Sequence, residues 1–287
     1  MGVEDISWNF IEYMKAGRES IAKSRSLRYF LKPILNLQGE ECVLDVGCGI
    51  GTVVKLLRPL LGTRGKIIGI DIDPALVEYG NLHWARQPNV RLEVGDATQI
   101  AYPDAAFDVV ISMGLLEFVS DRKQEQVLSE MARVLRPSGS VIVIQVDSVH
   151  YLTLPENASF KAFYEGILEG MRQRGVDLEL TRFKAICQQR DWIPEGFTFN
   201  FEYHTQITER FVHLLEEQDR TSYFENTEYL EQAHKFNFQF LQGVGWTKRQ
   251  LWEYLNSQLE SQIAFFREHI GEEYYQKTPI CVFRVHF

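Results

Sequence analysis

The sequence predicts an α/β fold in which helices cover both faces of a mostly parallel, seven-stranded sheet. Between residues 41 and 145, five short runs rich in β-branched residues alternate with stretches whose apolar residues recur at helical spacing. This alternation is typical of parallel pairing, because a crossover helix returns the chain to the same end of the sheet after each strand. Two further strands are expected later in the chain, at residues 198–203 and 280–287.

Local patterns place each element of this core. Residues 5–36 precede it and are expected to be helical, because apolar side chains recur every three or four positions from Ile6 onward. The five strands are expected at residues 42–46, 66–70, 90–94, 107–111 and 140–144, and the helices between them at residues 52–61, 74–85 and 122–135. The Arg-Pro-Ser-Gly stretch at residues 136–139 predicts a helix stop followed by a turn.

After residue 146 the alternation of strands and helices stops. Residues 156–192 and 208–277 are expected to be largely helical, with the strand at residues 198–203 between them. A closing strand after so long a helical segment indicates an insertion that covers the functional edge of the sheet. We therefore predict three parts: a helical segment at residues 1–39, an α/β core at residues 40–150, and a helical cap at residues 151–287 that contains the last two strands.

Composition narrows the possible classes of function. The 287-residue chain carries a net charge of −9, which disfavours nucleic acid as the main partner because that affinity comes from clustered Lys and Arg. No run approaches the ~20 apolar residues of a membrane span, and the amino terminus is acidic where a secretory signal is basic. The four cysteines lack metal-ligand spacing. We expect a cytoplasmic protein with free thiols, no metal site and no membrane contact.

A glycine-rich turn follows the first predicted strand, in the stretch Asp-Val-Gly-Cys-Gly-Ile-Gly at residues 45–51. Glycine at three alternate positions permits positive φ and lets a ligand approach the backbone closely. A dinucleotide fingerprint has its third glycine one residue later, where this chain has Thr52. Asp45, two residues before the first glycine, is a poor neighbour for a pyrophosphate and a good one for an ammonium group. The turn therefore favours a positively charged nucleoside ligand.

Two more acidic residues end predicted strands at the same edge of the sheet. Asp71 ends the second strand, and a carboxylate there suits two hydrogen bonds from ribose hydroxyls. Asp73 precedes Pro74 and is expected to cap the next helix. Asp96 ends the third strand, where its carboxylate can accept a bond from an adenine amino group while the Ala97 amide donates to the ring.

Five motifs, in order and spacing, resemble those of the S-adenosylmethionine-dependent methyltransferases with a Rossmann-like fold (class I, small-molecule type). They are DVGCGIG, IIGIDID, LEVGDA, FDVVISMGLLEFVSD and ARVLRPSGSVIVI, which together span about residues 40–146. The resemblance implies S-adenosylmethionine as methyl donor and S-adenosylhomocysteine as product. A nicotinamide-dependent, NAD(P)-linked oxidoreductase and a non-catalytic binding protein on the same fold remain as alternatives.

The resemblance also implies which residues contact the cofactor. The methionine portion would lie beside the glycine turn, the ribose at the end of the second strand and the adenine at the end of the third, and Tyr13 in the amino-terminal helix would close over them. In this sequence the implied positions are Tyr13, Asp45, Gly47, Gly49, Gly51, Asp71, Ile72, Asp96, Ala97, Ser112 and Met113.

The acid–base residues of the reaction are not part of these motifs. Methyl transfer from a sulfonium needs a base only if the acceptor must lose a proton. Glu117 and His150 follow the fourth and fifth strands and are the catalytic candidates, with His204 as a third. Many relatives have a His-His-like pair where this chain has Glu117-Phe118, so Glu117 can equally be an acid at a helix start, and His150 a loop histidine without a ligand.

The acceptor is expected to be a small molecule. The Asn/Asp-Pro-Pro-aromatic motif of enzymes that methylate DNA or protein is absent, since the stretch after the fourth strand reads Ile-Ser-Met-Gly at residues 111–114. Most of the 19 Phe, 12 Tyr and 5 Trp lie after residue 150, and many of them lie at residues 208–277. Aromatic faces in a lid favour a flat, aromatic or apolar acceptor, or a cationic one. Homo-oligomerisation is left open.

Overall fold

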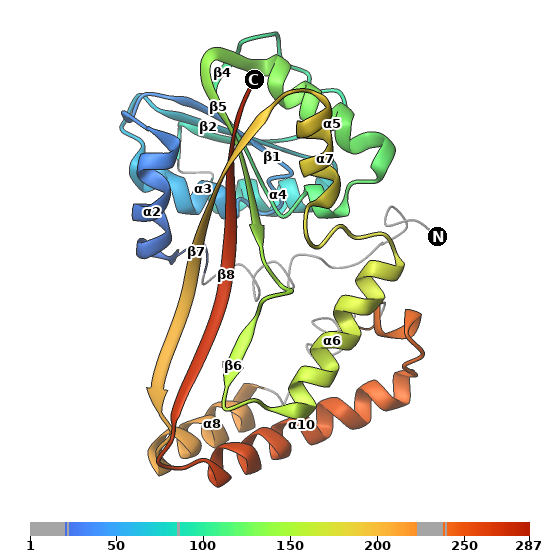
Figure 1. The fold of residues 1–287 in the computed structure, drawn as a ribbon. Coiled ribbons are helices and arrows are strands. Elements are labelled where there is room, and N and C mark those ends of the chain that lie inside the picture. The colour runs from blue at the N-terminus through green and yellow to red at the C-terminus, as the bar shows by residue number, and fades with distance from the viewer. Residues whose placement is uncertain (1–20, 22, 85–86, 223–237, 239) are drawn as a thin grey trace. The chain divides into compact units, whose positions relative to one another are not determined.

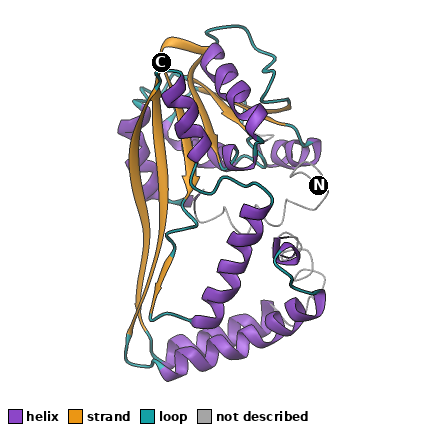
Figure 2. Cartoon of the chain, turned by 45° about the vertical axis from the view of Figure 1, so that its right-hand side comes forward, coloured by secondary structure: helices purple, strands orange, loops and turns teal. Residues whose placement is uncertain are grey.

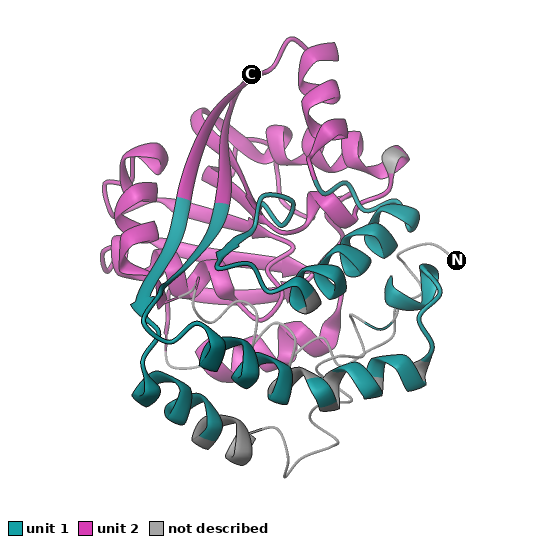
Figure 3. Ribbon diagram, turned by 60° about the horizontal axis from the view of Figure 1, so that its bottom comes forward, with its two compact units in different colours: residues 1–9, 147–178, 200–279 teal, residues 10–146, 179–199, 280–287 magenta. Residues whose placement is uncertain are grey.

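The computed structural model describes residues 21, 23–84, 87–222, 238 and 240–287 (Figure 1). Tyr13 and the first part of the predicted amino-terminal helix lie outside these residues. The chain separates into two compact units (Figure 3). Unit 2 comprises residues 10–146, 179–199 and 280–287, and unit 1 comprises residues 1–9, 147–178 and 200–279.

Unit 2 contains the predicted parallel sheet. The strands are β1 (Cys42–Val46), β2 (Lys66–Asp71), β3 (Val90–Val94), β4 (Phe107–Met113) and β5 (Leu135–Val146), in the spatial order β3-β2-β1-β4-β5. All four pairings between them are parallel, as the alternation of strands and helices predicts. The last strand, β8 (Glu273–His286), pairs antiparallel with β5 and also pairs with β7 (Ile193–Gln206). The α/β prediction with a mostly parallel sheet is confirmed.

Helices follow the strands of unit 2 in the predicted order. They are α2 (Arg25–Leu35), α3 (Thr52–Leu57) with the short 3-10 helix η2 (Arg58–Leu60), α4 (Pro74–Trp84), η3 (Leu116–Phe118), α5 (Asp121–Val134) and α7 (Thr181–Gln189). Successive residues of β1 and β4 are buried although their side chains point to alternate faces, so both faces of the sheet are covered. On one face, Met131 of α5 and Phe183 of α7 belong to the same buried cluster as Leu44 of β1.

Unit 1 contains most of the helices predicted after residue 150. These are α6 (Ala158–Gln173), α8 (Glu209–Ser222) and α10 (Lys248–Glu268), together with the short strand β6 (Leu152–Leu154). The side chain of Asn157 caps α6 by accepting from the Phe160 amide at 3.0 Å, and Thr247 forms a capping box with Gln250 at the start of α10. Figure 2 shows the strands β7 and β8, each of which continues from one unit into the other.

Three local expectations are wrong. Helix does not continue to residue 277, because β8 begins at Glu273 and its residues 275–277 pair with β6, an eighth strand that the sequence pattern did not predict. The strand expected at residues 198–203 is much longer, as β7. Residues 136–139 lie within β5 instead of a separate turn. Phe107 of β4 pairs with Leu135, and Val109 pairs with Ser140. Residues 136–139 of β5 therefore form a bulge between these two pairs.

Candidate functional site

The glycine turn at the end of β1 adopts the backbone conformation that its residues permit. Gly47, Gly49 and Gly51 have φ of +74°, +52° and +88°, all in the left-handed region that disfavours side chains. The turn is fastened to the next strand, because the amides of Gly47 and Cys48 both donate to the Ile70 carbonyl, at 2.8 and 3.0 Å. The chain then enters α3 at Thr52. The turn thus lies at the carboxyl end of β1, where open α/β sheets bind their ligands.

Two large side chains pack tightly against this turn. A Cβ at Gly51 would lie 2.5 Å from the indole nitrogen of Trp84, and one at Gly47 would lie 3.0 Å from the Leu115 side chain. The Trp84 nitrogen is buried without a hydrogen-bond partner in the described structure. Neither residue was predicted for this site. In sequence, Trp84 is one residue near the end of the helix predicted at residues 74–85, and nothing in its spacing indicates that it supports the turn.

Asp45 is the most unusual charged residue of unit 2. It is fully buried in β1, and neither of its carboxylate oxygens has a hydrogen-bond partner among the described residues. Burial raises the pKa of Asp45 well above its ordinary value, and the nearby Asp71 raises it further. A buried carboxylate without donors is costly, so Asp45 is a candidate for a group whose hydrogen-bond donors a bound ligand supplies.

Asp71 ends β2 and links the second strand to the glycine turn. Its Oδ2 accepts from the Gly49 amide at 2.8 Å, and its Oδ1 accepts from the Asp73 amide at 3.0 Å. Burial raises the pKa of Asp71, and these backbone bonds act in the opposite direction. Ile72 follows with 72% of its surface exposed. Asp73 accepts from the Ala75 amide at 2.8 Å, which confirms the prediction that it caps α4.

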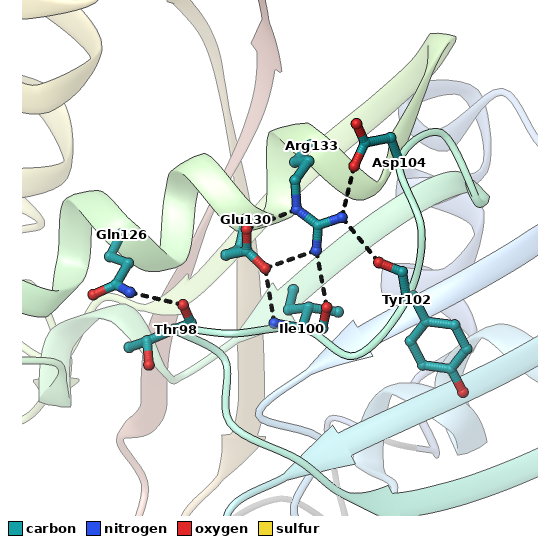
Figure 4. A network of polar contacts seen from close by, with 7 residues as sticks. All are labelled: Thr98, Ile100, Tyr102, Asp104, Gln126, Glu130 and Arg133. Carbon is teal, nitrogen blue, oxygen red and sulfur yellow. Dashed lines mark hydrogen bonds and ion pairs between the residues drawn. The ribbon is translucent and has the colours of Figure 1, made fainter.

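Asp96 lies in the loop after β3, and Thr98 fixes its carboxylate. Its Oδ1 accepts from the Thr98 hydroxyl at 2.7 Å and from the Thr98 amide at 2.8 Å, and these bonds lower the pKa of the exposed Asp96. The loop is tied to α5 over several residues (Figure 4). Gln126 donates to the Thr98 carbonyl at 3.0 Å, and Glu130 accepts from the Ile100 amide at 2.8 Å.

Arg133 of α5 forms the densest part of this network. Its guanidinium donates to the carbonyls of Ile100 and Tyr102, at 2.9 Å each, and pairs with Glu130 and Asp104 at 2.7 and 2.8 Å (Figure 4). The Glu130 hydrogen bond is the largest cause that raises the pKa of Arg133, so the group is a permanent cation. The network holds the loop that carries Asp96 against α5.

We expect Arg133→Ala to lower the free energy of unfolding by roughly 1–3 kcal/mol, because it removes charge-assisted bonds to two carbonyls and two carboxylates at once. Thermal unfolding measures this loss. The control is Arg249→Ala, which removes a single exposed ion pair with Glu253 on α10 and should leave the melting temperature unchanged. Equal effects of the two substitutions would contradict the role assigned to the network.

The end of β4 also borders the glycine turn. Ser112 and Met113 are buried, and the Ser112 hydroxyl has no hydrogen-bond partner among the described residues. Gly114 follows with φ of +70°, and its amide donates to the Ile144 carbonyl at 3.0 Å. The fourth parallel strand therefore ends in a glycine at the same edge of the sheet as β1 and β2, with a buried hydroxyl just before it.

The catalytic candidates belong to different units. Glu117 lies in η3 of unit 2 and is buried. His150 lies in unit 1, where its exposed ring is held by Asp147, with Nδ1 at 3.0 and 2.8 Å from the two carboxylate oxygens. His204 of β7 has a similar arrangement, with Nδ1 3.1 Å from Glu273.

The described residues contain no group of three or more His, Cys, Asp or Glu side chains placed to hold a metal ion. Within the same residues, none of the helices combines the length and apolar character that a bilayer crossing requires. All four cysteines, Cys42, Cys48, Cys187 and Cys281, are free thiols.

Together, the parallel sheet, the glycine turn and the acidic residues at three strand ends define a nucleoside-binding α/β enzyme. A family model described as "Methyltransferase domain" matches residues 43–139. A demethylmenaquinone methyltransferase of Staphylococcus aureus is 32% identical over 201 residues, which cover 70% of this chain and 73% of that protein. The chain belongs to the class I S-adenosylmethionine-dependent methyltransferase family, so S-adenosylmethionine is its cofactor and S-adenosylhomocysteine the product.

Two further comparisons set the extent of this likeness. An uncharacterized 37.1 kDa transposon protein of Streptomyces fradiae is 32% identical over 124 residues, and the chain spans only 35% of it. The solved structure of the YcgJ protein of a Bacillus species superposes with a TM-score of 0.52 at 15% identity, covering 91% of this chain and 98% of that one, which shows a shared fold. Because the chain belongs to this family, the methyltransferase hypothesis is favoured over the two alternatives, an NAD(P)-dependent oxidoreductase and a non-catalytic binding protein.

The residues of the glycine turn fit this cofactor. S-adenosylmethionine carries an ammonium group, and the buried Asp45 offers two oxygens without protein donors. The positive φ of Gly47, Gly49 and Gly51 gives the turn the tight backbone conformation in which glycine is favoured, and Leu115 and Trp84 pack where Cβ atoms of Gly47 and Gly51 would lie.

Proposed function

We propose that the protein methylates a small aromatic or apolar metabolite. The observation that carries this proposal is the concentration of packed aromatic rings in unit 1. Phe163 stacks on Tyr254 with ring centroids 4.3 Å apart, and Trp246 meets Tyr254 edge-on at 5.8 Å. The likeness to a demethylmenaquinone methyltransferase, whose name specifies a quinone as the substrate, supports a ring-containing acceptor.

In this proposal, the sequence-predicted residues of unit 2 hold the cofactor. Asp45 accepts hydrogen bonds from the ammonium group beside the glycine turn, and Asp71 accepts from the ribose while it continues to hold Gly49. Asp96 and the Ala97 amide bind the adenine, and the exposed Ile72 offers an apolar surface for the nucleoside. Ser112 and Met113 lie along the cofactor at the end of β4. Tyr13 is proposed to close over it.

The bound cofactor supplies an electrophilic methyl group on a sulfonium with a good leaving group. The protein's contribution is then to position the acceptor, to exclude water and, where the acceptor is a hydroxyl, to remove its proton. Asp147 holds Nδ1 of His150 at 2.8 Å, which favours the tautomer with the proton on Nδ1 and leaves Nε2 as the basic atom. We propose His150 as the base, and Glu117 as the alternative base.

The test of this function is product formation. The purified protein is incubated with S-adenosylmethionine and a panel of small acceptors, including a hydroxylated naphthalene, an aliphatic alcohol and a charged amine. We expect a methylated product, detected by mass spectrometry, from the ring compound. Methylation of the charged amine alone would contradict the proposed acceptor class.

We expect His150→Ala to lower kcat by about 10²–10⁴-fold, the usual contribution of a general base, with the affinity for S-adenosylmethionine unchanged. His213→Ala is a matched control, because it removes another carboxylate-paired, exposed histidine of the same unit and should change kcat less than twofold. Steady-state kinetics of both variants measure the difference. If kcat is unchanged in His150→Ala and falls strongly in Glu117→Gln, Glu117 and not His150 is the general base.

A further inference from the structure

Unit 1 contains a cavity of about 220 Å³ that no part of the cofactor site uses. Its walls come from the segment around β6, the first turn of α6, the second half of α10 and the start of β8. Half of the lining side chains are aromatic: Tyr151, Phe160, Phe265, Phe266 and Tyr274. The volume is below the ~300–1,000 Å³ of sites for drug-sized molecules, so the cavity suits a smaller ligand.

The alternation of side chains along β8 explains which residues of the sheet line the cavity. β6 and β8 pair antiparallel, with Thr153 opposite Gln276 and Leu154 opposite Tyr275. Because side chains alternate along a strand, Tyr274 and Gln276 share the face of β8 that borders the cavity. Tyr275 points to the other face, where its hydroxyl donates to Glu202 at 3.0 Å.

The spacing of residues along α10 explains which of its side chains line the cavity. Gln262, Phe265 and Phe266 of α10 are spaced three and four residues apart, so they lie on one face of the helix and line the cavity together. Phe266 meets Tyr274 edge-on with ring centroids 5.3 Å apart, which joins the helical wall to the sheet wall. Phe160 of α6 and Tyr151 also line the cavity, with their ring centroids 5.9 Å apart. The cavity thus presents ring faces and edges from three elements.

The polar groups of the cavity are all uncharged. None of the residues that line it among the described ones is Asp, Glu, Lys, Arg or His. The hydroxyls of Tyr151 and Tyr274 hydrogen-bond to each other, and burial raises the pKa of both, so both are neutral at physiological pH. Asn157 uses its Oδ1 to cap α6, and its amide nitrogen carries N–H donors. The lining therefore offers neutral donors and acceptors around an aromatic interior.

We propose that this cavity binds an uncharged one- or two-ring compound with hydroxyl or carbonyl groups. Ring stacking supplies apolar contact, and the amide nitrogens of Asn157, Gln262 and Gln276 can donate to the oxygen atoms of the ring substituents. A charged ligand would lose its hydration without meeting an opposite charge, so the cavity selects against it.

The test compares two ligands that share a ring system and differ in charge, 1-naphthol and 1-naphthoate. Calorimetric titration of the full chain should show 1-naphthol binding and naphthoate binding at least tenfold weaker. Gln276→Glu keeps the size of the side chain and places a negative charge in the lining, so it should weaken 1-naphthol binding at least fivefold. Gln242→Glu, at an exposed position of the same unit, should leave that affinity within twofold.

The same variants separate this inference from the proposed function. Gln276→Glu should leave the affinity for S-adenosylhomocysteine unchanged, because Gln276 is not among the residues proposed to hold the cofactor. Equal binding of 1-naphthol to wild type and Gln276→Glu, or preferred binding of naphthoate, overturns the inference whatever the transfer assay shows. Selective binding of 1-naphthol, weakened in Gln276→Glu, supports the ring site whether or not the transfer assay yields a methylated ring compound.

Discussion

Asp45→Asn is expected to stabilise the cofactor-free protein while it weakens cofactor binding at least tenfold. The carboxyl is fully buried, has no hydrogen-bond partner among the described residues, and has its pKa raised by burial. Asparagine has nearly the same shape and carries no charge to desolvate. Cofactor binding suffers because an ammonium group loses its counter-charge, and a tenfold loss corresponds to about 1.4 kcal/mol.

The stability gain of this variant should depend on pH in a defined direction. The pKa of Asp45 is higher in the folded protein than in the unfolded chain, where it is ~4. The carboxyl therefore favours folding most at pH values below ~4, where it is protonated in both states. That contribution is lost as the pH rises through the folded-state pKa. Wild type and Asp45→Asn should therefore unfold at similar temperatures near pH 4, and the variant should be the more stable one at neutral pH.

Thermal unfolding between pH 4 and pH 8, with and without S-adenosylhomocysteine, measures both effects. The control is Asp108→Asn on the neighbouring strand, where the carboxylate accepts from the Cys42 amide at 2.9 Å and pairs with Arg136. Removing a partnered charge should bring no gain in stability at neutral pH. A lower melting temperature for Asp45→Asn than for wild type at pH 7, or an unchanged cofactor affinity, would contradict the role given to Asp45.

Gly51→Ala is expected to abolish measurable cofactor binding and to lower the melting temperature. The substitution places a side chain at φ of +88°, and its Cβ would lie 2.5 Å from the rigid indole of Trp84. The left-handed backbone alone costs roughly 1–2 kcal/mol, and relief of the collision must displace either the turn or the indole. Both displacements change the surface that faces the cofactor.

A substitution at Gly175 distinguishes the effect of backbone strain from the effect of the steric clash with Trp84. Gly175 has φ of +80°, and a Cβ there would meet nothing within 4 Å, so Gly175→Ala carries nearly the same backbone strain without the contact. We expect it to lower the melting temperature modestly and to leave cofactor affinity unchanged. Combining Gly51→Ala with Trp84→Phe should recover part of the binding. Equal losses in Gly51→Ala and Gly175→Ala would show that the packing of Trp84 is irrelevant.

The parts of the fold that the sequence predicts are those fixed by local physics. The central strands β1, β4 and the second half of β5 are buried on both faces, so they contain apolar runs such as the one at residues 141–144. The glycines at 47, 49 and 51 mark a turn because only glycine adopts positive φ at little cost. Asp73 is recognisable as a cap from its place before Pro74.

The features that the sequence does not predict depend on tertiary contacts. β7 has alternating half-exposed positions over 14 residues, so only its Phe-rich centre stands out as a strand. The start of β8 lies next to a long amphipathic helix and becomes a strand through its pairing with β6. The close packing of Trp84 on Gly51 joins residues from different elements. The lack of hydrogen-bond donors around Asp45 among the described residues likewise depends on which side chains the fold places beside it. No spacing along the chain shows them.

Calorimetric titration of S-adenosylmethionine and S-adenosylhomocysteine into wild type and Asp71→Ala tests the central claim most directly, because Asp71 both holds the glycine turn and is proposed to bind the ribose. We predict that wild type binds both compounds and that Asp71→Ala binds them at least tenfold more weakly while it retains its far-UV circular dichroism. Absence of binding by wild type, or equal affinity in Asp71→Ala, would contradict the account.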